Sequence, residues 1–226
     1  MNTIPDHYHL NHLQQDLYLI PQKAVFWKNK DILIVSDLHF GKAGHFRKAG
    51  IAIPAEIHDS DFKLLDQLIK NYDPSSIIFL GDLFHSILNN QWLDLASWVV
   101  RNNDLPVHLV KGNHDILPKE LYKFDNVEIH EDALILEPFI FTHKPLDYPI
   151  EENLYNISGH IHPAITLKGK ARQSLKLPCF YFGKKNGLLP AFGKFTGNSL
   201  LKINKEDLVY VITGHSVICA HTLGNL

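Results

Sequence analysis

The residues with the clearest chemical potential in this sequence stand directly after short apolar runs. In LVKGNHD, at 109–115, such a run leads to the amide of Asn113, the imidazole of His114 and the carboxylate of Asp115. Four other runs end in the same way, and they supply Asp37 and His39, Asp82, His143, and His160 and His162. Mixed imidazole and carboxylate side chains are ligands that suit Mn, Fe or Zn better than Mg.

This set is too large for one ion. Without His114 and Asp115 it holds two Asp, one Asn and four His, which makes seven candidate ligands. An octahedral ion takes about six ligands, water usually included. Two ions that share one carboxylate would use all seven, and paired ions roughly 3.5–4 Å apart clamp the attacking and leaving oxygens in phosphoryl transfer. A single Asp after a strand usually forms a turn or caps a helix, and a single His is usually a surface residue or a satisfied core residue. The recurrence at five strand ends is what indicates a metal centre.

Parallel strands are the elements that can bring these residues together. Apolar runs and helical spacing predict, in order, strand 31–37, helix 60–72, strand 75–82, helix 91–103 and strand 106–113. We expect Ser60 to cap the first helix. Such alternation implies right-handed crossovers and parallel strands, whose carboxyl ends meet at one edge, where ligands bind. Tight turns or close backbone approach at these ends are expected at Gly81, Gly112 and Gly159.

After residue 125 the sequence breaks into short strand-like runs separated by turn residues, so this half is expected to be mostly β. No linker rich in Pro, Gly or Ser divides the halves, and we expect a single domain over 1–226. The expected fold is α/β, with two sheets packed face to face and helices outside. The histidine-rich segment 7–12 is expected to be a mobile terminus.

Composition argues against several classes of protein. Hydrophobic residues make up 45% of the 226 residues and charged residues 20%, and the net charge of −2 argues against a general polyanion binder while leaving room for a local basic patch. Cys179 and Cys219 are the only cysteines and form no CxxC pair, which favours a reduced, cytoplasmic protein without a cysteine zinc site. We expect neither a signal peptide nor a membrane span. Motifs of P-loop enzymes, dinucleotide enzymes, serine hydrolases and zincin peptidases are missing.

The order of the five blocks resembles a known signature. D-x-H at 37–39, G-D at 81–82, G-N-H-D at 112–115, an isolated His at 143 and G-H-x-H at 159–162 are similar to the motifs of the calcineurin-like metallophosphoesterases. Segments 36–54 and 177–197 extend the likeness over most of the chain, toward the ligase-associated DNA damage response endonuclease (PdeM) branch. The resemblance implies a β-sandwich flanked by helices, in four layers α/β/β/α.

Carried over residue by residue, the resemblance implies two divalent metal ions, with Mn expected and Fe, Zn or Ni as alternatives. It assigns the first ion to Asp37, His39, Asp82 and His162, and the second to Asp82 as bridge, Asn113, His143 and His160. His114 would steady the phosphate and protonate the leaving oxygen. Asp115 would orient the His114 ring, and a cap of a helix or turn is an equally open role for it.

The resemblance also implies a substrate and partners. It favours hydrolysis of phosphodiesters in nucleic acid during DNA repair, beside an ATP-dependent DNA ligase and a helicase. His85 stands where many phosphatase relatives carry an arginine, which argues against a protein phosphatase. We expect Lys42, Arg47 and His85 to contact substrate, the alternative for the two cations being a solvated basic turn. A small-nucleotide phosphodiesterase and a metal-binding scaffold without turnover stay open, as does the oligomeric state, a dimer included.

Overall fold

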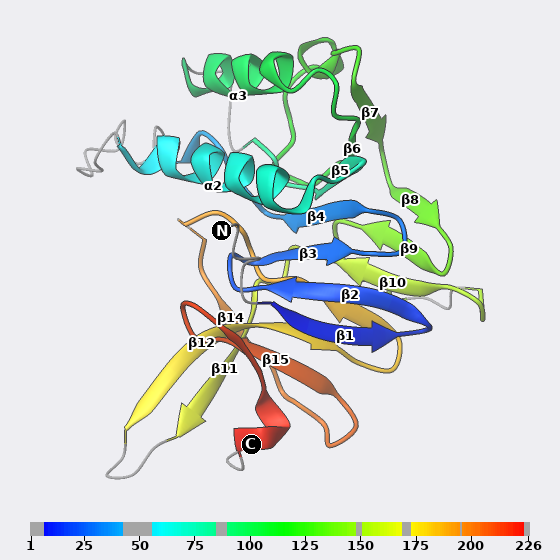
Figure 1. Ribbon diagram of the computed structural model, residues 1–226, viewed down its shortest axis with the longest axis vertical. Helices are drawn as coiled ribbons and strands as arrows, with labels where there is room; N and C mark the ends of the chain where they lie inside the picture. The colour runs from blue at the N-terminus through cyan, green and yellow to red at the C-terminus, as the bar shows by residue number, and fades with distance from the viewer. Residues whose placement is uncertain are drawn as a thin grey trace.

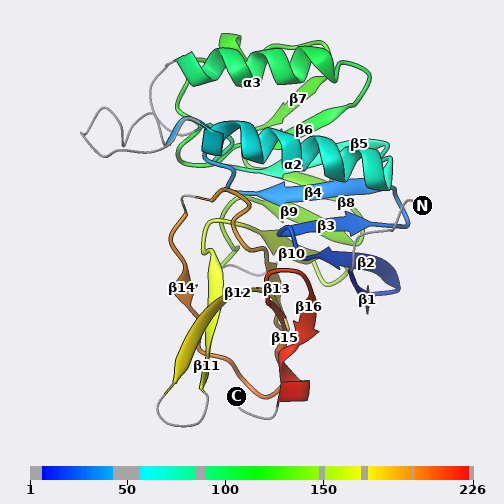
Figure 2. The ribbon, with the colours of Figure 1, turned by 60° about the vertical axis from the view of Figure 1, so that its left-hand side comes forward.

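The computed structural model describes residues 7–42, 56–84, 90–147, 151–168, 173–194 and 196–223. Two β-sheets pack face to face, and the α-helices α2 (Glu56–Tyr72) and α3 (Asn90–Arg101) cover the outer face of the first sheet (Figures 1 and 2). The expected α/β sandwich is confirmed. Among the described residues, no helix is both long and apolar enough to cross a membrane.

The first sheet carries the parallel strands that the sequence predicts. Its strand order is β1 (Tyr8–His12), β2 (Gln15–Ile20), β3 (Ala24–Trp27), β4 (Ile32–Ser36), β5 (Ser76–Leu80), β6 (Val107–Val110) and β7 (Val127–His130). Strands β4 to β6 are parallel, as expected from the alternation of strands and helices. Strand β7, which the sequence places in the mostly β half, joins this sheet parallel to β6. Helix α2 begins at Glu56 instead of following a cap at Ser60, so the predicted cap is wrong.

The N-terminal segment contradicts the expectation of a mobile terminus. Strand β1 pairs with β2 in an antiparallel hairpin, and its Leu10 is buried. The ring of Tyr8 packs 4.7 Å from that of Tyr210 in the second sheet. The turn residues Leu13 and Gln14 both have positive φ, 52° and 61°, as a two-residue hairpin turn requires. Such turns usually carry Asn or Gly, and the absence of those residues hides the hairpin in the sequence.

The second sheet confirms the mostly β character of the second half. Its main path is β14 (Ser199–Leu200), β11 (Pro163–Lys168), β12 (Ser174–Phe182), β13 (Asn186–Leu188), β10 (Tyr155–Ser158), β9 (Phe139–Thr142) and β8 (Ala133–Leu136). Strand β12 also pairs with β15 (Leu208–Ile212), which pairs with β16 (Val217–Cys219). The remaining described elements are the 3-10 helices η1 (Lys119–Tyr122) and η3 (Ala220–Leu223).

Successive side chains of a strand point to opposite faces of a sheet, and both faces of the first sheet are covered. On β4, Leu33 and Val35 face the helices, whereas Ile32 and Ile34 face the second sheet. This double burial explains why the strands read as continuous apolar runs. The outer face of the second sheet, with Cys179, packs against Ala220 of η3. In the described part of the chain, η3 alone represents the expected outer helical layer on that side.

Asp61 on α2 offers a test of the buried face of this helix. Burial raises the pKa of Asp61 to about 6, although the charges of Lys194 and Lys23 oppose the rise. The unfolded chain releases this proton near pH 4, so the carboxylate destabilises the fold progressively as the pH rises from about 4 to 6. We expect Asp61→Asn to raise the free energy of unfolding by about 2 kcal/mol at pH 8 and by little at pH 4.

The measurement is urea unfolding at both pH values, with a chelator present so that metal loading does not vary with pH. Asp94→Asn, on the exposed face of α3, is the control and should change neither value much. An equal effect of Asp61→Asn at pH 4 and pH 8 would contradict the assigned cause.

Candidate metal centre

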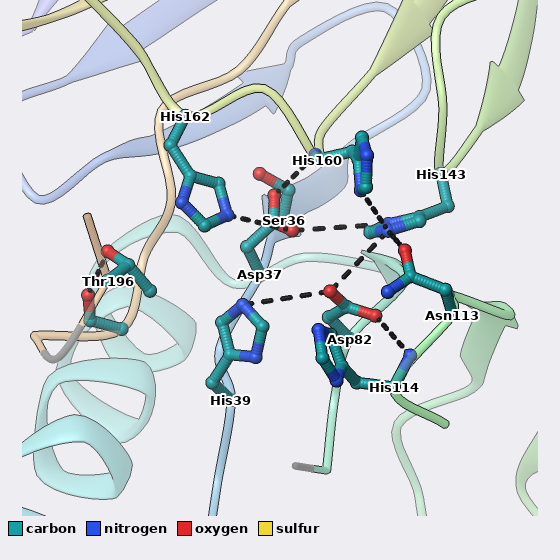
Figure 3. A network of polar contacts seen from close by, with 12 residues as sticks. Ser36, Asp37, His39, Asp82, Asn113, His114, His143, His160, His162 and Thr196 are labelled. Carbon is teal, nitrogen blue, oxygen red and sulfur yellow. Dashed lines mark hydrogen bonds and ion pairs between the residues drawn. The ribbon is translucent and has the colours of Figure 1, made fainter. Parts of the chain in front are cut away.

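The predicted ligands meet where strands of both sheets end. Asp37 follows β4, Asp82 follows β5 and Asn113 lies beyond the end of β6, all in the first sheet. In the second sheet, His143 follows β9, and the pair His160 and His162 lies beyond the end of β10. Figure 3 shows their side chains pointing toward one another from these separate elements. Residues up to 125 positions apart in sequence therefore share one site, as the strand-end pattern predicts.

One cluster of donor atoms comprises Asp37, His39 and His162, whose candidate ligand atoms all lie within 4.8 Å of one another. Asp37 is fully buried, and its Oδ1 lies 3.2 Å from Nε2 of His162. Burial raises the pKa of Asp37, but the hydrogen bond and charge of His162, the charge of His143 and the backbone N–H of His160 together outweigh it, so that the pKa is lower than usual. The carboxylate is therefore kept ionised, which is the form that binds cations.

The second cluster comprises Asp82, His143 and His160, again with all candidate donor atoms within 4.8 Å. Nε2 of His143 lies 3.1 Å from Nδ1 of His160 and 3.1 Å from Oδ1 of Asn113. Burial and the neighbouring His143 lower the pKa of His160. A neutral imidazole is the form that a metal requires, so this donor set fits a divalent cation.

Asp82 lies between the two clusters. Its Oδ2 is 3.7 Å from Nε2 of His39 on one side and 3.5 Å from Nε2 of His143 on the other. Its Oδ1 accepts a hydrogen bond of 2.8 Å from the backbone N–H of His114. The hydrogen bond to Oδ1 thus fixes the orientation of the carboxylate, while Oδ2 faces both clusters, as a bridging ligand must.

Five of the predicted ligands have a left-handed backbone. The φ angles of Asp37, His39, Asp82, His160 and His162 lie between 50° and 65°. This conformation is uncommon for residues with a side chain and costs about 1–2 kcal/mol each. Strain of this kind concentrates at functional sites. Here it turns side chains out of the strand direction and toward a common point.

Two glycines allow the loops to close around the carboxylates. A Cβ atom on Gly112 would overlap the backbone amide and carboxylate of Asp82, and one on Gly159 would overlap the carboxylate of Asp37. At the end of β5, Gly81 has a φ of 72°, which supplies the expected turn. The predicted close approach and tight turn at these glycines are both confirmed.

Backbone carbonyls orient two of the histidine rings, and sequence reasoning missed them. Nδ1 of His143 lies 3.0 Å from the carbonyl oxygen of Leu80, and Nδ1 of His162 lies 2.9 Å from that of Gly197. In each ring, Nε2 is then left to face the carboxylates. Carbonyl groups leave no mark in the residue types. The one signal was the likeness of segment 177–197 to the family, and that segment includes Gly197.

His114 and Asp115 stand beside the clusters. The His114 ring lies 5.4 Å from the His39 ring and belongs to neither group of donors. Its role as a proton donor stays a prediction. Asp115 accepts hydrogen bonds from the backbone N–H groups of Phe84, at 3.0 Å, and Gly112, at 2.9 Å. Burial raises its pKa to about 6 despite these bonds. These contacts join the GNHD loop to the segment that follows Asp82, and both roles given for Asp115 stay predictions.

Of the three predicted substrate contacts, the structure describes one. Lys42 is partly buried near the clusters, and burial lowers its pKa while the charges of Asp82 and Asp37 oppose that shift. The interaction of Lys42 with these two carboxylates places it near the centre. Arg47 and His85 lie outside the described residues.

Comparisons with known proteins identify the family of this chain. The sequence model of the family described as calcineurin-like phosphoesterase matches residues 30–219. The crystal structure of Pseudomonas putida nuclease MPE superimposes with a TM-score of 0.77 and 27% identity, covering 95% of this chain and 100% of that one. Yfce, a phosphoesterase from E. coli, gives a TM-score of 0.46 and 13% identity, covering 83% of this chain and 96% of that one. No curated protein sequence matches. The matched family and the two clusters together indicate a dinuclear metal site.

Asp82→Asn tests whether this carboxylate serves both ions. Asparagine keeps the oxygen that accepts from the His114 N–H but replaces the oxygen that faces both clusters. We expect the metal content, measured by plasma mass spectrometry after dialysis, to fall for both ions. We expect phosphodiester turnover to fall by roughly 10²–10⁴-fold, because the ions supply several kcal/mol of charge stabilisation. Full retention of one ion would contradict the proposal that Asp82 bridges the two ions. Asp94→Asn again serves as the control.

Proposed function

The chain belongs to the calcineurin-like phosphoesterase family and is a metal-dependent phosphoesterase, and from this premise we propose that it is a nuclease acting on phosphodiester bonds in nucleic acid. The observation that carries the proposal is the likeness to the Pseudomonas putida nuclease, which extends over nearly the whole chain. The exposed Asn113 at the border of the centre adds to it, since a polymer can reach a site that opens to solvent.

The two clusters divide the metal ligands between them. Asp37, His39 and His162 would hold one ion, Asn113, His143 and His160 the other, and Asp82 both. When bound, the ions neutralise charge on the phosphate and lower the pKa of coordinated water. Manganese is the metal we propose, following the resemblance, with Fe, Zn or Ni as substitutes, and a donor set of imidazoles, carboxylates and one amide can hold each of these metals.

His114 is the residue that we propose as the general acid. Its backbone is tied to Asp82, and its ring lies beside that of His39 without entering a ligand cluster. A proton held there can be delivered to the leaving oxygen as the ester bond breaks. We propose that Asp115 positions His114 indirectly. The two backbone hydrogen bonds that Asp115 accepts hold the GNHD loop against the segment that follows Asp82.

The biological setting of the proposal comes from the resemblance of segments 36–54 and 177–197 to the ligase-associated endonucleases. We place the reaction in DNA repair in the cytoplasm, on single-stranded or damaged nucleic acid, together with an ATP-dependent DNA ligase and a helicase. Lys42, beside the centre, is the described residue that we propose to contact the substrate backbone, and Arg47 and His85 are proposed to assist.

A comparison of two substrates across salt concentrations tests the proposed substrate class. We expect cleavage of labelled single-stranded DNA to weaken with salt, because log K falls by about 0.7 for each phosphate contact on a single strand. Turnover of 2′,3′-cyclic AMP should depend little on salt. Lys42→Ala should flatten the salt dependence for DNA and leave the small diester unaffected. Lys30→Ala, which removes an exposed lysine just before β4, at the opposite end of that strand from Asp37, is the matched control.

Other outcomes would assign a different function. Efficient turnover of the cyclic nucleotide with DNA untouched at low salt would identify a small-nucleotide phosphodiesterase. Absence of turnover on every diester, from folded and metal-loaded protein, would identify a scaffold.

His114→Ala separates the acid from the ligands. We expect metal stoichiometry to stay at the wild-type value while kcat on DNA falls by roughly 10²–10⁴-fold. The loss should be much smaller on bis-p-nitrophenyl phosphate, because p-nitrophenolate leaves without a proton. Loss of metal, or an equal loss on both substrates, would show that His114 acts in another way.

A further inference from the structure

A third group of metal-binding side chains lies where β6 pairs with β7, the last strand of the first sheet (Figure 1). His108 on β6 is directly opposite Glu128 on β7, and His130 follows two residues later. Because side chains alternate along a strand, Glu128 and His130 lie on the same face. Their neighbours Val127 and Ile129 pack against the helix side, so the three polar groups face away from the helices.

The donor atoms of this group have the spacing of a coordination site. Nδ1 of His108 lies 3.3 Å from Nε2 of His130 and 3.2 Å from Oε2 of Glu128. Nε2 of His130 lies 3.8 Å from Oε1 of Glu128. Tetrahedral Zn with bonds of about 2.0–2.1 Å separates its ligand atoms by about 3.3 Å. The three groups can therefore reach one ion with little rearrangement.

Burial and charge in this group also favour a cation. The histidine side chains are only 23% and 14% exposed, whereas Glu128 is 66% exposed at the rim. The ion pairs that the structure gives Glu128 are with these two histidines, so no lysine or arginine in the described residues neutralises its charge there. Burial, together with the charge of His108, lowers the pKa of His130 despite Glu128, which keeps the ring in the form that metals bind.

We propose that His108, Glu128 and His130 form a third metal site, apart from the dinuclear centre, that binds Zn²⁺ or another late first-row divalent cation. Two imidazoles and one carboxylate, with one position open to solvent, are a recognised zinc donor set. The order of affinities of divalent metals for such ligands favours Ni²⁺, Cu²⁺ and Zn²⁺ over Mn²⁺. This inference rests on the β6–β7 geometry and not on the proposed nuclease function.

The proposed ion would link the edge strand to the strand that leads into the GNHD loop. The backbone N–H of Lys111 donates to the carbonyl oxygen of His130 at 2.9 Å, two residues before Asn113. A cation held by both strands would strengthen this connection. Its role is structural: it would brace the loop of the dinuclear centre from behind, without touching the substrate.

The test counts zinc ions on the full chain by equilibrium dialysis. We expect three Zn²⁺ per wild-type chain, and two per chain in Glu128→Gln and in His108→Asn/His130→Asn. The affinity of the third ion should fall more than the roughly 10–100-fold typical of changes to residues around the ligands. Glu131→Gln is the matched control, because this neighbouring glutamate pairs with Lys111 and Lys119 instead, and it should keep all three ions.

A second readout is hydrogen exchange of the β7 amides, which Zn²⁺ should slow in wild type and Glu131→Gln but not in Glu128→Gln. Only two ions in wild type, or a third ion retained in both ligand variants, would overturn the proposal. Because Glu128→Gln keeps every residue of the dinuclear centre, its turnover with Mn²⁺ should equal that of wild type. Failure of the nuclease proposal is therefore measured separately from failure of this one.

Discussion

The carboxylate of Asp82 is the group on which the rest of the site depends. One of its oxygens is fixed by the His114 N–H, and the other faces histidines from both clusters. That position requires β5 to end beside β6 and opposite β9, and it requires Gly112 to leave room for the carboxylate. The parallel pairing of the first sheet and its packing on the second are therefore conditions for the chemistry, since no single loop could collect these donors.

The two sheets contribute differently to this arrangement. The first sheet delivers the two carboxylates, the amide of Asn113 and one imidazole, that of His39. The second sheet delivers the other histidines of the clusters. The shared apolar layer, which includes Trp27, Phe139 and Phe141, holds the two sets of loops at a fixed separation. A segment from beyond β13 closes the site, because Phe192 and Gly193 donate backbone hydrogen bonds to Ser36 and Asp37.

Residue types and spacing were enough to predict the parallel core and the set of side chains that meet at its edge. They were enough because each ligand lies within a few residues of the end of an apolar run, a pattern that depends on local sequence alone. The N-terminal hairpin was missed because Leu13 and Gln14 adopt a turn that their side chains do not favour. The carbonyls that orient His143 and His162 have no signature in residue type, and the His108 group depends on strand register, which one sequence does not specify.

The left-handed residues of the centre have a consequence for the thermodynamics of metal uptake. At about 1–2 kcal/mol each, these five conformations together reduce the stability of the fold by several kcal/mol. The apolar layers on the two faces of the first sheet offset that loss. The ligands are thus preorganised, and metal association need not supply the entropy of ordering five loops. Each ion would then meet donor groups that the two sheets already hold in place, so that its binding energy would appear as affinity instead of being offset by the cost of ordering loops.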